Sequence, residues 1–142
     1  AIIRKIMQRL FFSLILIILI GCGNKSPVNI YESEGYKNLS ANDIKIGESI
    51  WASTCFRCHM YGSMGAVSVN DKKHFDELAA KGFEQLSKRV TDGMEGARGV
   101  MPPKGSCYSC SKDELEKAVY YIFHLAQKAH EIEITKNVSN EK

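Results

Sequence analysis

The sequence predicts an all-α fold of about four helices in one small domain. Apolar residues recur at helical spacing in four separate stretches between positions 41 and 129. Two of these stretches begin with a serine that is followed three residues later by an acidic residue, which is the pattern of a helix capping box. No stretch of useful length alternates apolar and polar residues as a half-buried strand would. Together these observations favour a domain built from helices alone.

The first 21 residues have the organisation of a bacterial export signal. Three basic residues precede an apolar run at 10–20, which is too short for a comfortable membrane span. The run ends in Leu19-Ile20-Gly21-Cys22, which resembles a lipobox, in which the cysteine becomes the lipidated first residue of the mature protein. We therefore expect a lipoprotein signal peptide over 1–21 and a lipid on Cys22 that tethers the protein to a membrane. An uncleaved N-terminal anchor is the alternative.

The segment after the signal predicts a flexible tether over 22–40, because it is rich in polar residues and shows no apolar period. The chain has 19 basic and 16 acidic residues, and three of the basic residues but none of the acidic ones belong to the signal. The processed chain is therefore close to neutral, which gives no support for nucleic-acid binding. Either N-terminal arrangement places the domain in the bacterial cell envelope, facing the periplasm or the exterior.

The first two helices follow the tether. Ser40 and Asp43 form the first capping box, and apolar residues continue from it at helical spacing. These residues are Ile46, Ile50 and Trp51. A second helix is expected from about Asp71 to Lys81, where Gly82 stops it. Its inward residues are Phe75, Leu78 and Ala79.

The second half of the domain contains two more helices with a loop between them. The third helix begins at Phe83, and Gly93 lies beyond its end. Four glycines and two prolines predict a loop from Gly93 to Gly105. Ser111 then opens the last helix with a capping box. The inward residues of that helix are Leu115, Ala118, Val119, Ile122, Leu125 and Ala129. The polar residues 130–142 are expected to fray.

The end of the first helical stretch contains Cys55-Phe56-Arg57-Cys58-His59, the attachment pattern of c-type haem. Two thioethers from Cys55 and Cys58 must reach the two vinyl groups of one porphyrin, and an imidazole from His59 then lies under the iron. A redox CxxC pair or half of a zinc site are the alternatives for the same residues. The motif predicts one covalently bound haem c with His59 as the proximal iron ligand.

The loop before the last helix supplies a candidate for the second axial ligand. Met101 is followed by Pro102 and Pro103, which stiffen the backbone and fix the direction of the methionine side chain. A thioether is a soft ligand suited to low-spin haem iron, and His/Met ligation raises the reduction potential. Met94 shares the loop and is the rival methionine. His74 is a further alternative, which would make a bis-histidine haem.

These motifs in this order resemble a class I c-type cytochrome with one haem. Met101-Pro102-Pro103-Lys104-Gly105, followed by Cys107-Tyr108-Ser109-Cys110 and an acidic helix start, resembles the bacterial cytochrome c-five group. The resemblance implies a small class I cytochrome c fold over 41–129, with helices packed around one covalently attached haem. It also implies that the two terminal helices cross at Gly47, close to Trp51 and to a tyrosine of the last helix.

The resemblance further implies a disulfide between Cys107 and Cys110. The exported compartment permits such a bond, and a catalytic dithiol of the thioredoxin kind is the alternative for this pair. The family commonly orients its ligand histidine with the carbonyl of a proline that follows the CxxCH motif. This chain has Gly65-Ala66-Val67 in that region and no proline. The resemblance therefore does not identify the hydrogen-bond partner that orients the His59 ring.

The function that the resemblance implies is transfer of single electrons, with no catalysis, as the iron cycles between its ferric and ferrous states. The expected partners are redox proteins, namely a quinol-oxidising complex and a terminal oxidase or reductase. One alternative is a haem c subunit fixed in a larger respiratory oxidase or reductase. The other is a peroxidase-like haem enzyme in which the distal ligand is displaceable.

Overall fold

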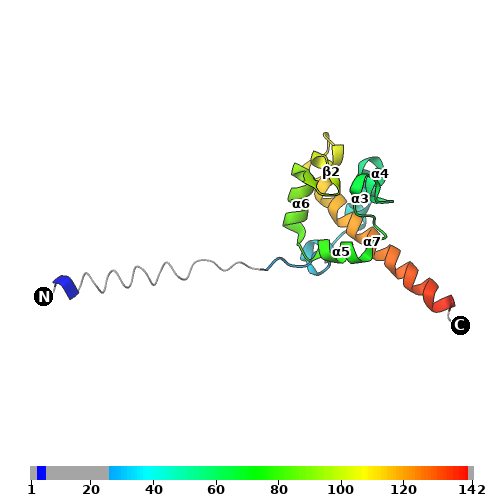
Figure 1. The fold of residues 1–142 in the computed structure, drawn as a ribbon, viewed down its shortest axis with the longest axis horizontal. Helices are drawn as coiled ribbons and strands as arrows, with labels where there is room; N and C mark the ends of the chain where they lie inside the picture. Colours follow the sequence, from blue (N-terminus) through cyan, green and yellow to red (C-terminus); the bar gives the residue numbers. More distant parts are fainter. Residues whose placement is uncertain (1–2, 6–25, 141–142) are drawn as a thin grey trace.

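The computed structural model describes residues 3–5 and 26–140, and in this part of the chain the all-α prediction is confirmed (Figure 1). Helices account for most of the described chain, and one small hairpin is added to them. No helix within residues 3–5 and 26–140 has the length and apolar character that a membrane crossing requires. The expected signal peptide, apart from residues 3–5, and the expected lipid site at Cys22 lie outside the described residues.

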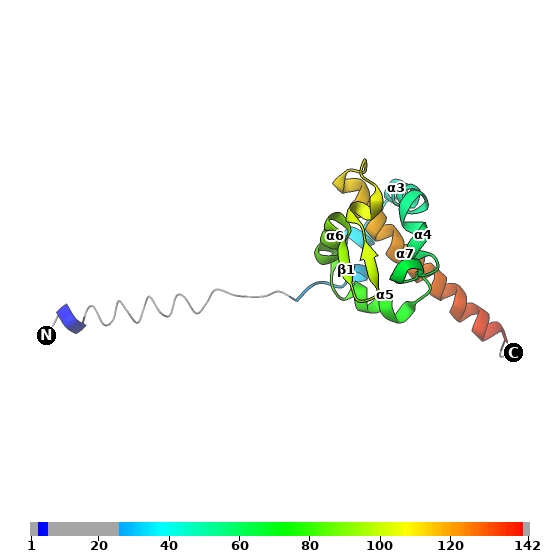
Figure 2. The same cartoon turned by 45° about the horizontal axis from the view of Figure 1, so that its top comes forward.

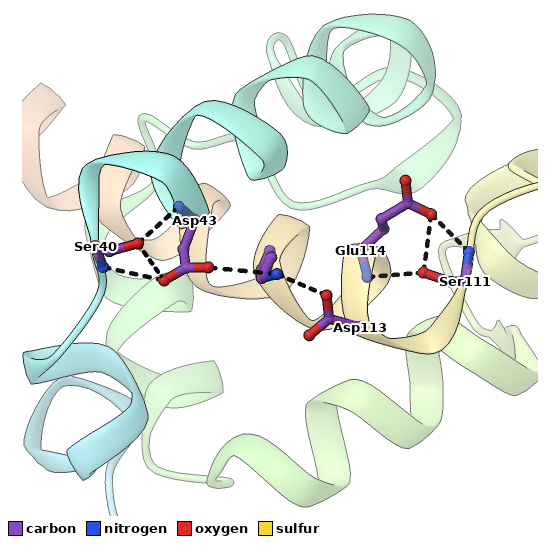
Figure 3. Close-up of polar contacts among 6 residues, drawn as sticks. Ser40, Asp43, Ser111, Asp113 and Glu114 are labelled. Atoms are coloured by element: carbon purple, nitrogen blue, oxygen red, sulfur yellow. Dashed lines mark hydrogen bonds and ion pairs between the residues drawn. The ribbon is translucent and has the colours of Figure 1, made fainter.

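The first large helix, α3 (Ala41–Ile50), begins at the predicted capping box. The Asp43 backbone N–H donates to Ser40 Oγ at 3.1 Å, and the Ser40 N–H donates to Asp43 Oδ2 at 3.1 Å (Figure 3). The helix continues without a break through the π-helical turn η2 (Trp51–Cys55) into α4 (Phe56–His59). The widened turn therefore ends at the first cysteine of the CxxCH motif. Single π turns of this kind are often found at functional sites.

The terminal helices α3 and α7 (Lys112–Asn140) cross at Gly47. A Cβ atom on Gly47 would lie 2.5 Å from the Lys117 carbonyl oxygen and 2.7 Å from Tyr121 Cβ, so only glycine permits this approach. Beside the crossing, Lys117 Nζ lies 3.3 Å from Asp43 Oδ1 and 2.6 Å from Asp113 Oδ2 (Figure 3). A side chain of α7 thus joins the first turns of both helices.

Helices α5 (Lys72–Ala79) and α6 (Phe83–Asp92) lie where the sequence predicts them. Asp71 caps α5, and the glycines at 82 and 93 lie just beyond the ends of the two helices. Both helices pack on α7, and the core between them is partly aromatic. Phe75 meets Phe123 edge-to-face at 5.2 Å, and Phe83 stacks on Tyr120 at 4.2 Å between ring centroids.

The expectation of a flexible tether is wrong for residues 30–37. This segment forms the short helices η1 (Ile30–Glu32) and α2 (Glu34–Lys37), which are packed against α7. Ile30 is completely buried, Tyr31 contacts Phe123 edge-to-face at 5.7 Å, and the Tyr36 hydroxyl donates to Gln127 Oε1 at 2.7 Å. A few irregularly spaced apolar residues are enough to dock the segment, so no helical period reveals it.

The segment between α6 and α7 is more regular than the predicted loop. Strands β1 (Met94–Gly96) and β2 (Gly99–Met101) pair antiparallel, and they face the viewer in Figure 2. The short helix η4 (Pro103–Ser106) follows. Its position matters for the site, because η4 contacts both α6 and the π turn η2.

The expected fraying after residue 129 is also wrong, because α7 continues to Asn140. No glycine or proline occurs in Lys112–Asn140 to stop the helix. The extension projects beyond the packed helices (Figure 1), and it exposes Ile132 and Ile134. His130 at its base is buried.

Candidate haem site

The two cysteines of the CxxCH motif are free thiols on adjacent turns of one continuous helix. Cys55 ends η2, and Cys58 lies three residues later in α4, so both face the same side of the helix. Both are partly buried, and burial raises the pKa of the Cys55 thiol above its ordinary value. The pair is therefore available for two thioether bonds to one group that lies along this face.

His59 is held in one orientation by the loop that follows it. Its Nδ1 lies 2.9 Å from the Val67 carbonyl oxygen. Because a carbonyl can only accept, Nδ1 carries the proton, which leaves the lone pair of Nε2 free for a metal. The Val69 N–H donates to the His59 carbonyl at 2.8 Å and fixes the same loop from the other side. Burial lowers the pKa of His59, which favours the neutral, ligating imidazole.

The Val67 carbonyl therefore orients the His59 ring, as a proline carbonyl does in the family that the motifs resemble. Because the acceptor is a backbone atom, a residue other than proline can supply it. This contact fixes the tautomer of His59 and increases the basicity of Nε2, as hydrogen-bond partners of metal-bound histidines commonly do.

Met101 and Met94 lie directly opposite one another in the register of the β1–β2 hairpin. Residues opposite one another in an antiparallel pair project from the same face, so both thioethers leave the hairpin on one side. Met101 is partly buried, whereas Met94 is 43% exposed. Pro102 and Pro103 follow Met101 directly, and Pro103 begins η4. The hairpin therefore keeps both methionines near each other, and the proline context distinguishes Met101.

The methionine segment contacts the chain near both ends of the CxxCH motif. Strand β2 contacts η3 (Ser63–Gly65), which follows His59, and η4 contacts η2, which ends in Cys55. The cysteines and His59 of one segment are thus brought together with Met101 of a segment more than 40 residues away. This arrangement is the one that a haem bonded to the first segment and ligated by the second would require.

The residues around the motif also fit a large apolar group. The exposed large apolar side chains on α4, on the loop after it and on the hairpin are Phe56, Tyr61, Met64, Met94 and Val100. Exposed apolar side chains of this kind suit contact with a large apolar group. Within residues 3–5 and 26–140, no three His, Cys, Asp or Glu side chains gather as a metal site would require. The half-zinc interpretation of the CxxC pair therefore has no support from neighbouring ligands.

The second pair of cysteines is joined in the structure. A disulfide links Cys107 to Cys110, with 5.4 Å between the Cα atoms. It closes the turn that leads into α7, where Ser111 and Glu114 form the second capping box (Figure 3). Lys104 Nζ donates to the Cys110 carbonyl at 3.1 Å, which joins the disulfide turn to η4. The bond therefore supports the loop that carries Met101 on its C-terminal side.

His74, the alternative distal ligand, is occupied with the start of its own helix. Its Nδ1 lies 2.6 Å from Asp71 Oδ2, and its backbone N–H donates to Asp71 Oδ1 at 3.1 Å. These bonds belong to the cap of α5 and hold the ring beside that cap. His124, on α7, lies beside Tyr121, with 6.4 Å between ring centroids.

Comparisons with known proteins identify a family and relatives of this chain. Residues 42–122 match the family model described as cytochrome c oxidase, cbb3-type, subunit III. The chain is 32% identical over 85 residues to cytochrome c-555 of Chlorobaculum tepidum, which covers 60% of this chain and 79% of that protein. It is 34% identical over 74 residues to cytochrome c5 of Ectopseudomonas mendocina, covering 51% of this chain and 80% of that protein.

A solved structure is similar as well. It is described as the crystal structure of an electron transfer complex of nitrite reductase with cytochrome c. The match has a TM-score of 0.51 at 31% sequence identity, and it covers 57% of this chain and 94% of the other.

Proposed function

Because this chain belongs to the cytochrome c family, as a monohaem protein of class I, we propose that it carries single electrons between respiratory proteins outside the cytoplasm. It is an electron-transfer protein with covalently bound haem c, as its relatives and structural neighbour indicate. The proposal adds the residues that hold the haem, the absence of catalysis, the membrane anchor and the class of partner.

Four residues hold the haem in this proposal. Cys55 and Cys58 would form its two thioethers, and His59 through Nε2 and Met101 through its sulfur would ligate its iron. The contacts of β2 with η3 and of η4 with η2 are the observation that carries the assignment, because they bring the Met101 segment close to both ends of the CxxCH motif. When bound, haem c supplies a one-electron ferric/ferrous couple.

The chain's own groups favour rapid electron transfer over bond-making chemistry. The Val67 carbonyl holds the His59 ring in place, and the prolines after Met101 restrict the movement of the thioether's backbone. A thioether ligand favours ferrous iron and raises the reduction potential. Because His59 and Met101 would both ligate the iron, no open position would remain for a substrate, and we therefore propose no catalytic activity.

Two experiments test the residue assignments. Denaturation in acid and organic solvent, followed by mass measurement, should give polypeptide plus one haem; haem that extracts freely would refute covalent attachment. Met101→Ala should abolish the thioether-to-iron charge-transfer band of the ferric protein and lower the reduction potential. Met94→Ala, at the paired position of the hairpin, is the matched control and should leave both unchanged. If the two variants exchange these results, Met94 is the ligand.

We also propose that lipid on Cys22 holds the protein to a membrane of the bacterial cell envelope. The docking of η1 on the domain supports a short reach, because Ile30 is completely buried and only seven residues separate it from Cys22. Fully extended, this stretch spans at most about 28 Å. The domain would then exchange electrons with partners in or on the same membrane. Cys22→Ser should block lipidation and that route of processing. Replacement of the whole N-terminus by a soluble-export signal should release a folded haem protein into the soluble fraction, whereas membrane retention after that replacement would show that a protein partner holds the domain.

A second candidate function is that of a haem subunit fixed in a larger complex. The observation that favours it is the description of the matching family model, which names a subunit of an oxidase. Purification from mild detergent separates the two functions. A subunit should co-purify with the other chains of its complex in fixed ratio, and an independent carrier should elute alone.

A further inference from the structure

Two glycines bring the backbone after His59 into direct contact with the backbone before Met101. Gly65 ends η3 at a positive φ of 81°, and a Cβ atom there would lie 1.7 Å from the Arg98 carbonyl oxygen. On the other side, a Cβ atom on Gly99 would lie 2.1 Å from the Met64 carbonyl oxygen. Neither glycine has room for a side chain, so the two main chains touch with nothing between them.

Each glycine lies two residues from a group that sets an axial ligand. Gly65 precedes Val67, whose carbonyl accepts from His59 Nδ1 at 2.9 Å. Gly99 precedes Met101 in the same strand. The backbone contact at the two glycines therefore joins the loop that orients His59 to the strand that carries Met101. A displacement at this contact would move one of these segments relative to the other.

We propose that Gly65 and Gly99 are positioning residues for the axial ligands, and that their backbone contact sets the separation between the two ligand-bearing segments. The proposal rests on the assignment of Met101 as the distal ligand. Neither glycine touches the iron; both act through the segments that carry Val67 and Met101.

The size of the expected displacement supports this role. Real Cβ atoms essentially never lie within 3.0 Å of a heavy atom to which they are not bonded, so alanine at 65 requires a movement of about 1.3 Å away from the Arg98 carbonyl oxygen. Alanine at 99 requires about 0.9 Å. Both obstacles are backbone atoms, which cannot rotate away as a side chain can. Functional sites hold their groups within about 0.5 Å of the working geometry, so either movement is large enough to disturb ligation.

The backbone of Met64 at the same contact is in an energetically unfavourable conformation. Its φ is 55°, in the left-handed region that residues other than glycine rarely adopt. The carbonyl that meets Gly99 belongs to this same residue. Such conformations persist where the surrounding structure over-determines them, often at functional sites.

The chain offers two matched controls for alanine variants of these glycines. Gly96 lies in the same hairpin, but a Cβ atom there would meet nothing closer than 3.8 Å. Gly82 has a comparable positive φ of 77° and a tight contact of 2.9 Å with Pro27 Cβ, but it lies between α5 and α6. Gly96→Ala controls for a change in the hairpin, and Gly82→Ala controls for loss of stability alone.

The test compares the four alanine variants as haem-loaded proteins. Gly65→Ala and Gly99→Ala should each lose at least half of the thioether-to-iron charge-transfer band and lower the reduction potential, whereas Gly96→Ala and Gly82→Ala should keep the wild-type band and potential. If Gly65→Ala and Gly99→Ala lose stability but keep the band and potential, as expected of Gly82→Ala, the proposal is wrong. Absence of the band from the wild-type protein would instead refute Met101 ligation, and the proposal with it.

If neither Gly65→Ala nor Gly99→Ala can be obtained with bound haem, a measurement on the wild-type holoprotein tests the proposal. Native-state amide hydrogen exchange should show the Val69 amide, which is bonded to the His59 carbonyl, opening in the same event as the amides of the β1–β2 hairpin. Separate openings with different free energies would overturn the link between the two segments.

Discussion

Replacement of Ile30 by alanine should lower the free energy of unfolding by about 3 kcal/mol. Ile30 is completely buried in the core cluster, although it belongs to the segment that the sequence suggests is a tether. The substitution removes three carbon atoms, which amounts to about 2.4 kcal/mol of lost transfer free energy at about 0.8 kcal/mol each. A partly relaxed cavity adds to this loss, within the range of roughly 2–5 kcal/mol for such truncations.

Chemical unfolding of the holoprotein, followed by circular dichroism and by haem absorbance, measures this loss. Val28→Ala is the matched control, because Val28 lies two residues earlier and is 59% exposed. It should change the free energy of unfolding by less than about 0.5 kcal/mol. If Ile30→Ala costs no more than Val28→Ala, the segment does not dock on α7. The short reach proposed for the Cys22 anchor would then be wrong as well.

Three further predictions follow from the packing, the caps and the disulfide. Gly47→Ala should lower the free energy of unfolding by about 2 kcal/mol, because its Cβ would lie 2.5 Å from the Lys117 carbonyl oxygen. An unchanged midpoint in thermal or denaturant unfolding would contradict the close crossing of α3 and α7. The Ser40 hydrogen bonds, followed by Lys117, lower the pKa of Asp43, so its stabilising effect is present above the unfolded pKa near 4 and is lost as the pH falls through the lower folded value. Asp43→Asn should therefore flatten the acid limb of the stability curve, and an identical limb would refute this contribution. Replacing Cys107 and Cys110 together by serine should cost about 2 kcal/mol, since the closed loop is short; reduction of the wild type should reproduce that loss while the haem spectrum persists.

The helices were predictable because their signals are local. The capping boxes at Ser40 and Ser111 are each satisfied within four residues. On α7 the helical period correctly predicts three buried residues, which are Leu115, Ala118 and Val119. In the following turns Phe123 and Ala126 are buried, whereas the predicted Ile122, Leu125 and Ala129 are only partly buried. The π turn that ends at Cys55 was not predictable in this way, because the sequence contains no residue type that marks it. The extension of α7 beyond residue 129 also lacks an apolar period, and only the absence of glycine and proline indicates it.

In the haem site, too, the residues with a local sequence signal were predictable and the non-local contacts were not. Cys55, Cys58 and His59 are adjacent in sequence, and their residue types state the chemistry directly. The acceptor for His59 is the Val67 carbonyl, and a backbone atom leaves no signature in the side chains. The contact between Gly65 and Gly99 joins segments far apart in the chain, so it becomes visible only once the hairpin is placed against η3. The docking of Ile30 is non-local for the same reason.

The absorption spectrum of the purified protein in its ferric and ferrous states reports haem attachment and iron ligation together. We expect covalently bound haem that is low-spin and six-coordinate in both states, with a thioether-to-iron charge-transfer band in the ferric state that disappears in Met101→Ala. Added small ligands should not alter the wild-type spectrum readily. A high-spin spectrum that shifts at once on addition of peroxide or a small gas would refute His59/Met101 ligation, because an open iron position is what a haem enzyme requires.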